Sequence, residues 1–197
     1  MKKITLATLL ILLTACSAVK VPSKNKFSLD RVSHEKLQKL PRHVTIEVAG
    51  VRAAPVYQTS DMIYVDKSYQ VKAFAYNEWA APPAEMLTPL VVESLRNSGA
   101  FFEIVPPLTT GKADYRLSVE LLSLQQQFTV MPNQVEVALT AQLYDFQTRQ
   151  PIASRRIVVR MEALTKDPYG GVLAANRAVQ QALRELTEFC RSAIASK

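Results

Sequence analysis

Few side chains in this 197-residue sequence have a type and spacing that could carry out a reaction. The two histidines, His34 and His43, do not combine with the cysteines into a set with metal-ligand spacing. Asp61 and Asp66 lie close together, but their surroundings are typical of turns, where aspartate binds nearby backbone groups. No nucleophile elbow, phosphate-binding loop or dinucleotide-binding glycine pattern occurs. We therefore expect no catalytic site, no metal and no cofactor, and we interpret the chain as a non-enzyme.

Cys16 is the exception, because the residues before it indicate covalent modification. Residues 1–15, MKKITLATLLILLTA, have a basic start, an apolar run of about ten residues and a small-residue end, as secretory signal peptides do. A helix that spans a bilayer needs about 20 apolar residues, so this run is too short to do so. The alternative is a buried core helix, which would not explain the leading lysines or the lack of a polar face.

The stretch LTAC that ends at Cys16 resembles the bacterial lipobox, in which the cysteine thiol is acylated and the chain is cut just before it. We predict that residues 1–15 are removed and that Cys16 carries several acyl chains, which together hold a protein firmly on a membrane. An aspartate after the cysteine favours the inner membrane in the sorting pattern, so Ser17 favours the outer membrane. The alternative is an ordinary signal peptide with a cysteine near its cut site by chance.

Composition indicates one exported globular domain. Hydrophobic residues make up 48% of the sequence, which is enough for a full core and argues against wholesale disorder. With Cys16 acylated, Cys190 has no partner for an intrachain disulfide, and its place on an apolar stripe predicts burial. The net charge of +7 suits nucleic acid, anionic lipid or a solvated surface. Export and the absence of nucleic-acid-binding motifs argue against nucleic acid.

Residues 16–41 predict a lipidated, flexible tether. They are polar, lysine-rich and weakly periodic, with one short helix expected near Ser33–Leu40. A flexible segment of this length has an average end-to-end distance of about 25–30 Å, so the folded domain would stay close to the membrane. We place that domain at residues 42–197, without an internal repeat or a second domain.

Alternating apolar and polar residues predict most of the strands of this domain. The later strands are long and joined by short connections, which is typical of an antiparallel meander with one wet face. Long strands are expected at 115–121, 135–143 and 157–161, and shorter ones at 43–48, 62–65, 69–76 and 101–105.

A first helix is predicted after the prolines at 82–83. Its apolar residues recur at steps of three and four, and Gly99 is a suitable stop. Pro89 leaves two alternatives open, because proline lacks the backbone N–H of an interior turn. Either the helix bends at Pro89, or it begins there with Thr88 as its cap.

A second helix is predicted from about Gly171 to Ala195, with Gly170-Gly171 as a hinge into it. Its apolar stripe should cover the dry face of the sheet. Three arginines on its far side are expected to be solvated, or else to form a docking edge for an acidic partner: Arg177, Arg184 and Arg191. The predicted fold class is α+β, an antiparallel sheet with two helices packed on one face.

The most unusual stretch, residues 61–86, is aromatic and lies ahead of the first helix. Phe74 and Tyr76 share a strand face with Lys72 and Gln70, and aromatic side chains on a mainly polar face suggest a contact surface. The residues predicted to contact a partner or lipid are Tyr64, Phe74, Tyr76 and Trp79. The alternative for Trp79 is a plug at the end of the core, beside the prolines.

Four segments occur in order behind the lipobox: DMIY, AYNEWAAPPAEML, LRNSGAFFEIV and ADYRLSVEL. Their order and spacing resemble the ABC-type transport auxiliary lipoprotein family, to which paraquat-inducible protein C-like lipoproteins belong. The resemblance covers roughly Val44 to Ile194. The family often has arginine before the tryptophan and Glu-Pro after Trp-Ala, whereas here Glu78 precedes Trp79 and Ala81 replaces the glutamate.

The resemblance implies a non-enzymatic component of a lipid-transport system. Such systems pair an inner-membrane ABC permease and ATPase with a periplasmic binding protein of the mammalian-cell-entry type. The lipoprotein would sit on the periplasmic face of the outer membrane and receive the far end of that conduit, with phospholipid or a similar hydrophobic compound as cargo. Homo-oligomeric rings are plausible in this family. The alternative is a lipoprotein that assembles or plugs an outer-membrane β-barrel.

Overall fold

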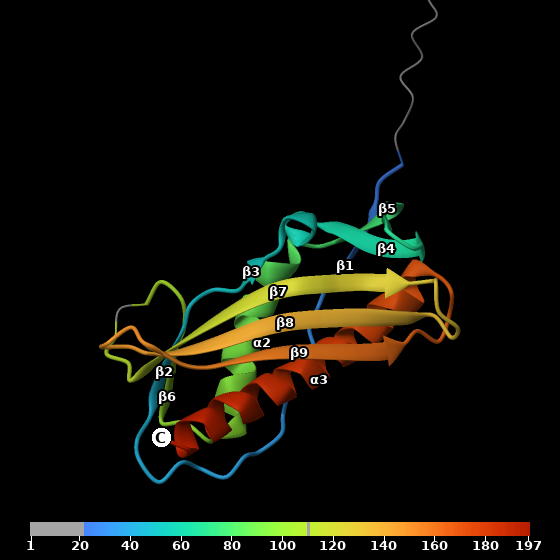
Figure 1. Ribbon diagram of the computed structural model, residues 1–197. Helices are drawn as coiled ribbons and strands as arrows, with labels where there is room; N and C mark the ends of the chain where they lie inside the picture. The colour runs from blue at the N-terminus through green and yellow to red at the C-terminus, as the bar shows by residue number, and fades with distance from the viewer. Residues whose placement is uncertain (1–21, 110) are drawn as a thin grey trace, which may run out of the picture.

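The computed structural model describes residues 22–109 and 111–197. They form a nine-stranded mixed sheet with two long helices against it, which confirms the predicted α+β class (Figure 1). The predicted signal peptide at residues 1–15, and Cys16 with it, lies outside the described residues. Within the described ranges, no helix is both long and apolar enough to cross a membrane.

The centre of the sheet is the predicted antiparallel meander. β7 (Tyr115–Gln127), β8 (Gln134–Asp145) and β9 (Pro151–Glu162) pair in this order along nearly their whole length. Alternate side chains of β8, from Val135 to Leu143, are buried, as the two-residue period of a strand requires. The three long strands are therefore where they were predicted, but β7 ends six residues later and β9 begins six residues earlier than predicted.

The other side of β7 corrects the prediction of an antiparallel sheet. β2 (Thr45–Val48), β3 (Arg52–Ala53) and β4 (Asp61–Lys67) lie along it one after another, and each pairs with it in parallel. The short 3-10 helix η1 (Pro55–Tyr57) separates β3 from β4, and β6 (Glu103–Val105) pairs in parallel with β2. Alternation gives the position of a strand but not its direction, so the sequence did not reveal these parallel pairs.

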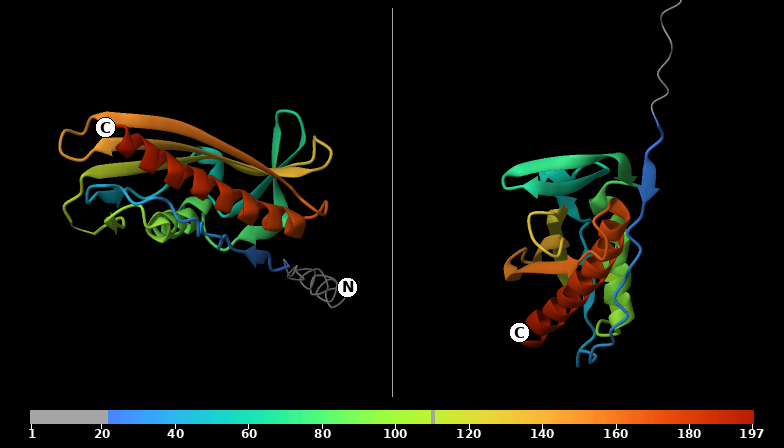
Figure 2. Two further views of the ribbon diagram at one scale, coloured as in Figure 1. Left: turned by 90° about the horizontal axis from the view of Figure 1, so that it is seen from below. Right: turned by 90° about the vertical axis from the view of Figure 1, so that its right-hand side faces the viewer.

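β4 turns back into β5 (Gln70–Trp79), and the two strands form a hairpin at the edge of the sheet. Tyr69 occupies the turn with a φ of 65°. β1 (Asn25–Phe27) pairs in parallel with the last part of β5 only. Figure 2 shows the hairpin turned out of the plane of the meander.

α2 (Pro83–Ser98) begins at the second of the two prolines and continues through Pro89. Thr88 is therefore not its cap, and the hydroxyl of Thr88 instead donates to the carbonyl of Ala84 at 2.8 Å. Gly99 ends the helix with a φ of 68°, as predicted, because a left-handed residue at this position costs glycine little.

α3 (Pro168–Ala195) packs diagonally across β8 and β9 on the same face of the sheet as α2 (Figure 2). Asp167 caps it by accepting the N–H of Gly170 at 2.7 Å. Cys190 lies on its buried face and is fully enclosed, as predicted. This burial disfavours the thiolate and raises the pKa of the Cys190 thiol to about 12.

The described part of the predicted flexible tether, residues 22–41, is packed against the domain, so the prediction of flexibility is wrong there. We call residues 22–41 the N-terminal segment. It forms β1 and then runs as an extended chain along both helices, with no helix at Ser33–Leu40 (Figure 2). Leu29, Val32 and Leu40 are buried in the core. Their irregular spacing among polar residues hid this role, because it follows neither the helical nor the strand period.

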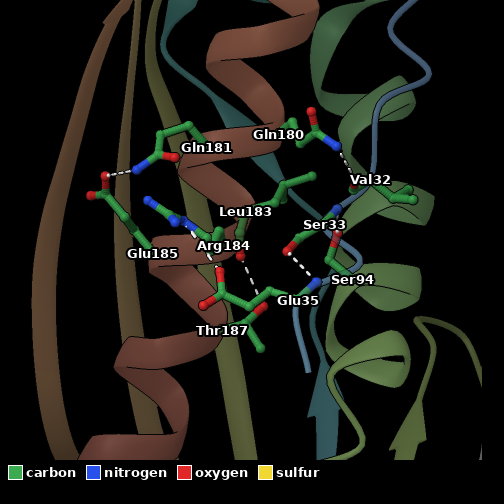
Figure 3. A network of polar contacts seen from close by, with 10 residues as sticks. All are labelled: Val32, Ser33, Glu35, Ser94, Gln180, Gln181, Leu183, Arg184, Glu185 and Thr187. Carbon is green, nitrogen blue, oxygen red and sulfur yellow. Dashed lines mark hydrogen bonds and ion pairs between the residues drawn. The ribbon is translucent and has the colours of Figure 1, made fainter. Parts of the chain in front are cut away.

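Polar contacts tie the N-terminal segment to both helices (Figure 3). The backbone N–H of Ser33 donates to the hydroxyl of Ser94 on α2 at 3.0 Å. On the other side, Nε2 of Gln180 on α3 donates to the carbonyl of Val32 at 3.0 Å. The segment therefore fills the space between α2 and α3 instead of leaving the domain.

The arginine stripe of α3 is exposed at Arg177 and Arg184, as expected, and its side chains also bind within the molecule. Nε of Arg184 lies 3.4 Å from the carboxylate of Glu35, and Nε of Arg191 donates to the carbonyl of Gln38 at 2.7 Å. Arg177 donates to the last carbonyl of β9 at 2.8 Å. Two of the three arginines thus hold the N-terminal segment in place.

Candidate functional site

Three aromatic side chains form a cluster on the β4–β5 hairpin. Tyr64 of β4 and Phe74 of β5 have ring centroids 4.5 Å apart. Phe128, just after β7, meets both rings edge-on, with centroid distances of 5.9 and 6.4 Å. All three side chains are half-buried. The structure thus brings together two of the predicted contact residues and adds Phe128, whose distance in the sequence gave no sign of this contact.

An ion pair borders the aromatic cluster. Nζ of Lys72 donates to the carboxylate of Asp66 at 2.8 Å across the hairpin. This hydrogen bond holds the pKa of Asp66 below its ordinary value and the pKa of Lys72 above its own. Because water screens exposed pairs, we expect the ion pair to add little to stability. It places both signs of charge beside the aromatic rings.

The other two predicted contact residues differ in exposure. Tyr76 is 58% exposed on β5, whereas Trp79 is only 4% exposed. The backbone N–H of Trp79 donates to the carbonyl of Ser60 at 2.7 Å, and Trp79 lines a small pocket of about 10 Å³ together with Phe74. Trp79 therefore does not belong to the exposed contact surface. It occupies the core, which was the alternative position for it.

The N-terminal segment is fixed beside this hairpin. Lys24 lies 3.3 Å from Glu78 and 3.7 Å from Asp61, and Lys26 lies 3.4 Å from Glu78. These contacts add to the pairing of β1 with β5. The described chain therefore begins next to the aromatic cluster, and Glu78 serves an internal contact.

Buried amides lock two neighbouring loops together. Nε2 of Gln126 donates to the side-chain carbonyl of Asn133 at 2.8 Å and to the backbone carbonyl of Asp167 at 3.3 Å. Nδ2 of Asn133 donates to the carbonyl of Ala163 at 3.2 Å. Buried polar networks of this kind hold their members in one arrangement. The β7–β8 loop and the β9–α3 loop therefore keep fixed positions beside the hairpin.

The two glycines interpreted as a hinge, Gly170 and Gly171, lie in the first turn of α3, where the chain packs too closely for a side chain. A Cβ on Gly170 would lie 2.2 Å from the hydroxyl and 2.6 Å from the carbonyl oxygen of Thr165. A Cβ on Gly171 would lie 2.3 Å from Oε1 of Gln126. Close approach, and not hinge motion, explains both residues.

A groove of about 800 Å³ lies at the opposite end of the meander. Its lining includes Arg116 of β7 and Glu47 of the neighbouring strand β2, whose charged groups are 3.9 Å apart. Leu108 also lines it and is fully exposed, with a φ of 64°. Arginine and aromatic side chains complete its lining: Arg52, Arg149, Tyr144 and Phe146. No sequence pattern predicts this set, because its members come from several strands and loops and no spacing links them.

The groups considered for catalysis do not meet. The ring of His43 stacks on Phe102 with centroids 4.5 Å apart, and His34 lies 3.5 Å from the amide of Asn97. Cys190 is enclosed in the core. In residues 22–109 and 111–197, no three histidine, cysteine, aspartate or glutamate side chains are grouped so that they could hold a metal ion.

The chain belongs to the family of the ABC-type transport auxiliary lipoprotein component, whose model matches residues 27–187. This finding confirms the family resemblance seen in the sequence. The match begins at the end of β1 and reaches into the second half of α3, so it includes most of the N-terminal segment. No curated protein matches the chain.

Several solved structures share the fold at low sequence identity. A protein of Xanthomonas campestris is 17% identical, with 87% of this chain and 98% of that chain covered and a TM-score of 0.79. An uncharacterized protein is 15% identical over 85% of this chain and 99% of its own, with a TM-score of 0.66. A hypothetical protein of Chlamydia trachomatis is 8% identical over 79% and 100%, with a TM-score of 0.56. Identities this low show a shared fold alone.

Proposed function

We propose that the chain is an outer-membrane lipoprotein and a non-enzymatic auxiliary component of an ABC transport system of the mammalian-cell-entry type, which moves lipid across the periplasm. The observation that carries the proposal is the family match over residues 27–187, behind a lipobox that ends at Cys16. Acyl chains on Cys16 hold the domain on the periplasmic face of the membrane, and Ser17 favours the outer membrane. ATP hydrolysis belongs to other components.

Two exposed surfaces support a binding role. The aromatic hairpin, with Tyr64, Phe74 and Tyr76, offers half-wet aromatic rings to lipid or to a partner. The groove at the opposite end offers arginine and aromatic side chains, which are enriched in protein interfaces. We assign the groove to the entry-type periplasmic protein, because the N-terminal segment begins at the aromatic end, where β1 pairs with β5, and the proposed anchor precedes it.

Self-association into a ring is part of the proposal. In the described residues β9 pairs with β8 only, so its outer edge is free to pair or pack with another copy. Light scattering of the acylated chain in detergent would measure the number of subunits. We expect a closed oligomer, and a monomer at all concentrations would remove this part of the proposal.

Co-purification tests the main proposal. An affinity-tagged full-length chain, extracted with mild detergent from its native host, should bring an entry-type periplasmic protein with it. Arg116→Glu reverses a charge in the groove and should lower that recovery at least several-fold. Arg31→Glu, an exposed change in the N-terminal segment, is the matched control and should leave the recovery unchanged. Recovery of an outer-membrane barrel without any entry-type protein would contradict the proposal.

A further inference from the structure

Exposed hydrophobic side chains gather at one end of the described molecule. That end comprises the β4–β5 turn, the β7–β8 loop, the β9–α3 loop and the start of α3 (Figure 1). Tyr69 is 106% exposed, Met131 and Leu164 are each 73% exposed, and Tyr169 is 59% exposed. Others at this end are Val71, Tyr76, Val130 and Leu173. Concentrated apolar exposure of this kind marks an interaction surface.

Strand pairing places these loops together. Val65, near the end of β4, pairs with Gln127, the last residue of β7. Glu162, at the end of β9, pairs with the first residue of β8. The chain segments that follow β4, β7 and β9 therefore leave the sheet at the same end. The rings of Phe27 and Tyr169, 6.2 Å apart, add β1 and the start of α3 to the group.

The proposed anchor is close to this end and far from the groove. Pro22, the first described residue, leads into β1, and six peptide units separate it from Cys16. An extended chain of that length reaches at most about 20 Å. β7 has 13 residues and runs from the groove to the apolar end. Arg116 of the groove lies eleven residues before Gln127 at the apolar end. A strand rises about 3.3 Å per residue, so Arg116 is about 35 Å from that end.

We propose that the apolar end is a membrane-contact surface, with Tyr69, Met131 and Leu164 seated in the headgroup region of the phospholipid leaflet that holds the acyl chains of Cys16. The inference rests on the acylation in the proposed function and adds an orientation to it. Tyrosine favours the membrane–water interface. Lys67 and Lys166 flank these residues, so that their ammonium groups meet lipid phosphates. The groove then faces away from the membrane, toward the periplasm.

Two exposed positions form a matched pair for the test. Tyr69 and Leu108 are each 106% exposed, and their φ values are 65° and 64°, but they lie at opposite ends. Tyr69→Cys and Leu108→Cys would each carry a nitroxide spin label on the acylated full-length chain. Cys190 is buried, so the label reacts with the introduced cysteine. Leu164→Cys provides a second position at the apolar end.

The labelled chains are reconstituted in vesicles of phosphatidylethanolamine and phosphatidylglycerol. Power saturation then measures collisions with oxygen, which enters the bilayer, and with a water-soluble nickel chelate. At positions 69 and 164 we expect the ratio of nickel to oxygen collisions to fall at least threefold when detergent is replaced by vesicles. At position 108 we expect no change.

Equal water access at positions 69 and 108 in vesicles would overturn the inference. Shielding of position 69 from both reagents would also overturn it, because it would indicate a protein contact, such as a second copy of the chain. Mass spectrometry of the N-terminal peptide from the same sample reports acylation separately. An unacylated native chain refutes both the proposed function and the membrane contact, whereas an acylated chain with a wet position 69 refutes only the membrane contact.

Discussion

The two ends of the β7–β9 meander share the same strands but expose different side chains. The end where the N-terminal segment begins presents Tyr69, Met131 and Leu164, which are exposed on three separate connections between elements. The other end presents a groove lined in part by Arg116 and Glu47. An apolar surface suits lipid, and a charged groove suits a folded partner with complementary charge. The difference suggests a molecule that bridges two unlike partners.

Removal of the anchor at Cys16 should have the largest effect on how the chain is held at the membrane. Cys16→Ala leaves no thiol to acylate, so we expect nearly all of the chain to move from the membrane fraction to the soluble periplasmic fraction. A turn with one apolar residue binds lipid weakly. Each CH₂ of an acyl chain that is buried in the bilayer adds about 0.8 kcal/mol to the free energy of membrane binding. Fractionation followed by immunoblotting measures the change.

Two controls accompany this change. Ser17→Ala alters the neighbouring residue and should leave the chain in the membrane fraction. Full membrane retention of a Cys16→Ala chain that mass spectrometry shows to lack residues 1–15 would contradict the expectation, and it would mean that the apolar end is itself the anchor.

A change in the N-terminal segment tests whether this segment is firmly packed against the rest of the domain. Leu29 is 4% exposed, and Leu29→Ala should lower the free energy of unfolding by about 2–4 kcal/mol, the usual cost of a cavity at a buried leucine. Urea denaturation followed by circular dichroism measures it. Arg31→Ala, at an exposed neighbouring position, should change stability by less than about 0.5 kcal/mol. A flexible tether would make the two variants equal.

The N-terminal segment also shows where prediction of the fold from sequence ends. The β7–β9 strands and both helices were predictable, because their apolar residues repeat with periods that follow from backbone geometry. Leu29, Val32 and Leu40 follow no such period. They are buried in the space between α2 and α3, which exists only after folding. The parallel pairing of β2, β3 and β4 with β7 depends in the same way on tertiary contacts.

The candidate site was predictable only in part for a related reason. Local alternation predicted that Phe74 and Tyr76 share a face of one strand, and Tyr64 lies in the adjacent strand of the same hairpin. Trp79 sits in the same strand as Phe74, but its burial depends on α3 and β1, which are distant in the sequence. The groove residues come from still more separate elements. The alternation of residues within a hairpin therefore predicts which side chains share a face. Which of them stay exposed depends on elements that are distant in the sequence and pack against that face.

One glycine at each end allows a comparison of local packing. Gly170→Ala, at the apolar end, places a Cβ against the backbone of Thr165 and should destabilise the fold by about 1–3 kcal/mol, as overpacking does. Gly111→Ala, near the groove, meets Val105 at an ordinary 3.6 Å and should cost less than about 0.5 kcal/mol. Thermal unfolding of both variants measures the difference. Equal midpoints would show that the loops at the apolar end are not tightly packed.

The smallest predicted effect concerns one aspartate at each end. The backbone N–H of Thr148, helped by Nζ of Lys197, lowers the pKa of Asp145 from 3.8 to about 2. The folded state therefore binds this proton less tightly than the unfolded state. The resulting stabilisation is present above about pH 4 and is lost as the pH falls toward 2. Asp145→Asn should flatten the fall in stability over that range, as measured by urea unfolding between pH 2 and 5.

A comparison with Asp66, at the apolar end, tests what lowers the pKa of Asp145. Its pKa is also lowered, but mainly by the side chain of Lys72, an exposed charge that salt screens. At 0.5 M NaCl we expect Asp66→Asn to lose its effect on the pH dependence, while Asp145→Asn keeps most of its own, because a backbone hydrogen bond is not a pairing of two charges. If both effects disappear in salt, the Lys197 contact and not the Thr148 N–H is the main cause of the lowered pKa of Asp145. The pKa of an aspartate would then be lowered by a lysine side chain at both ends.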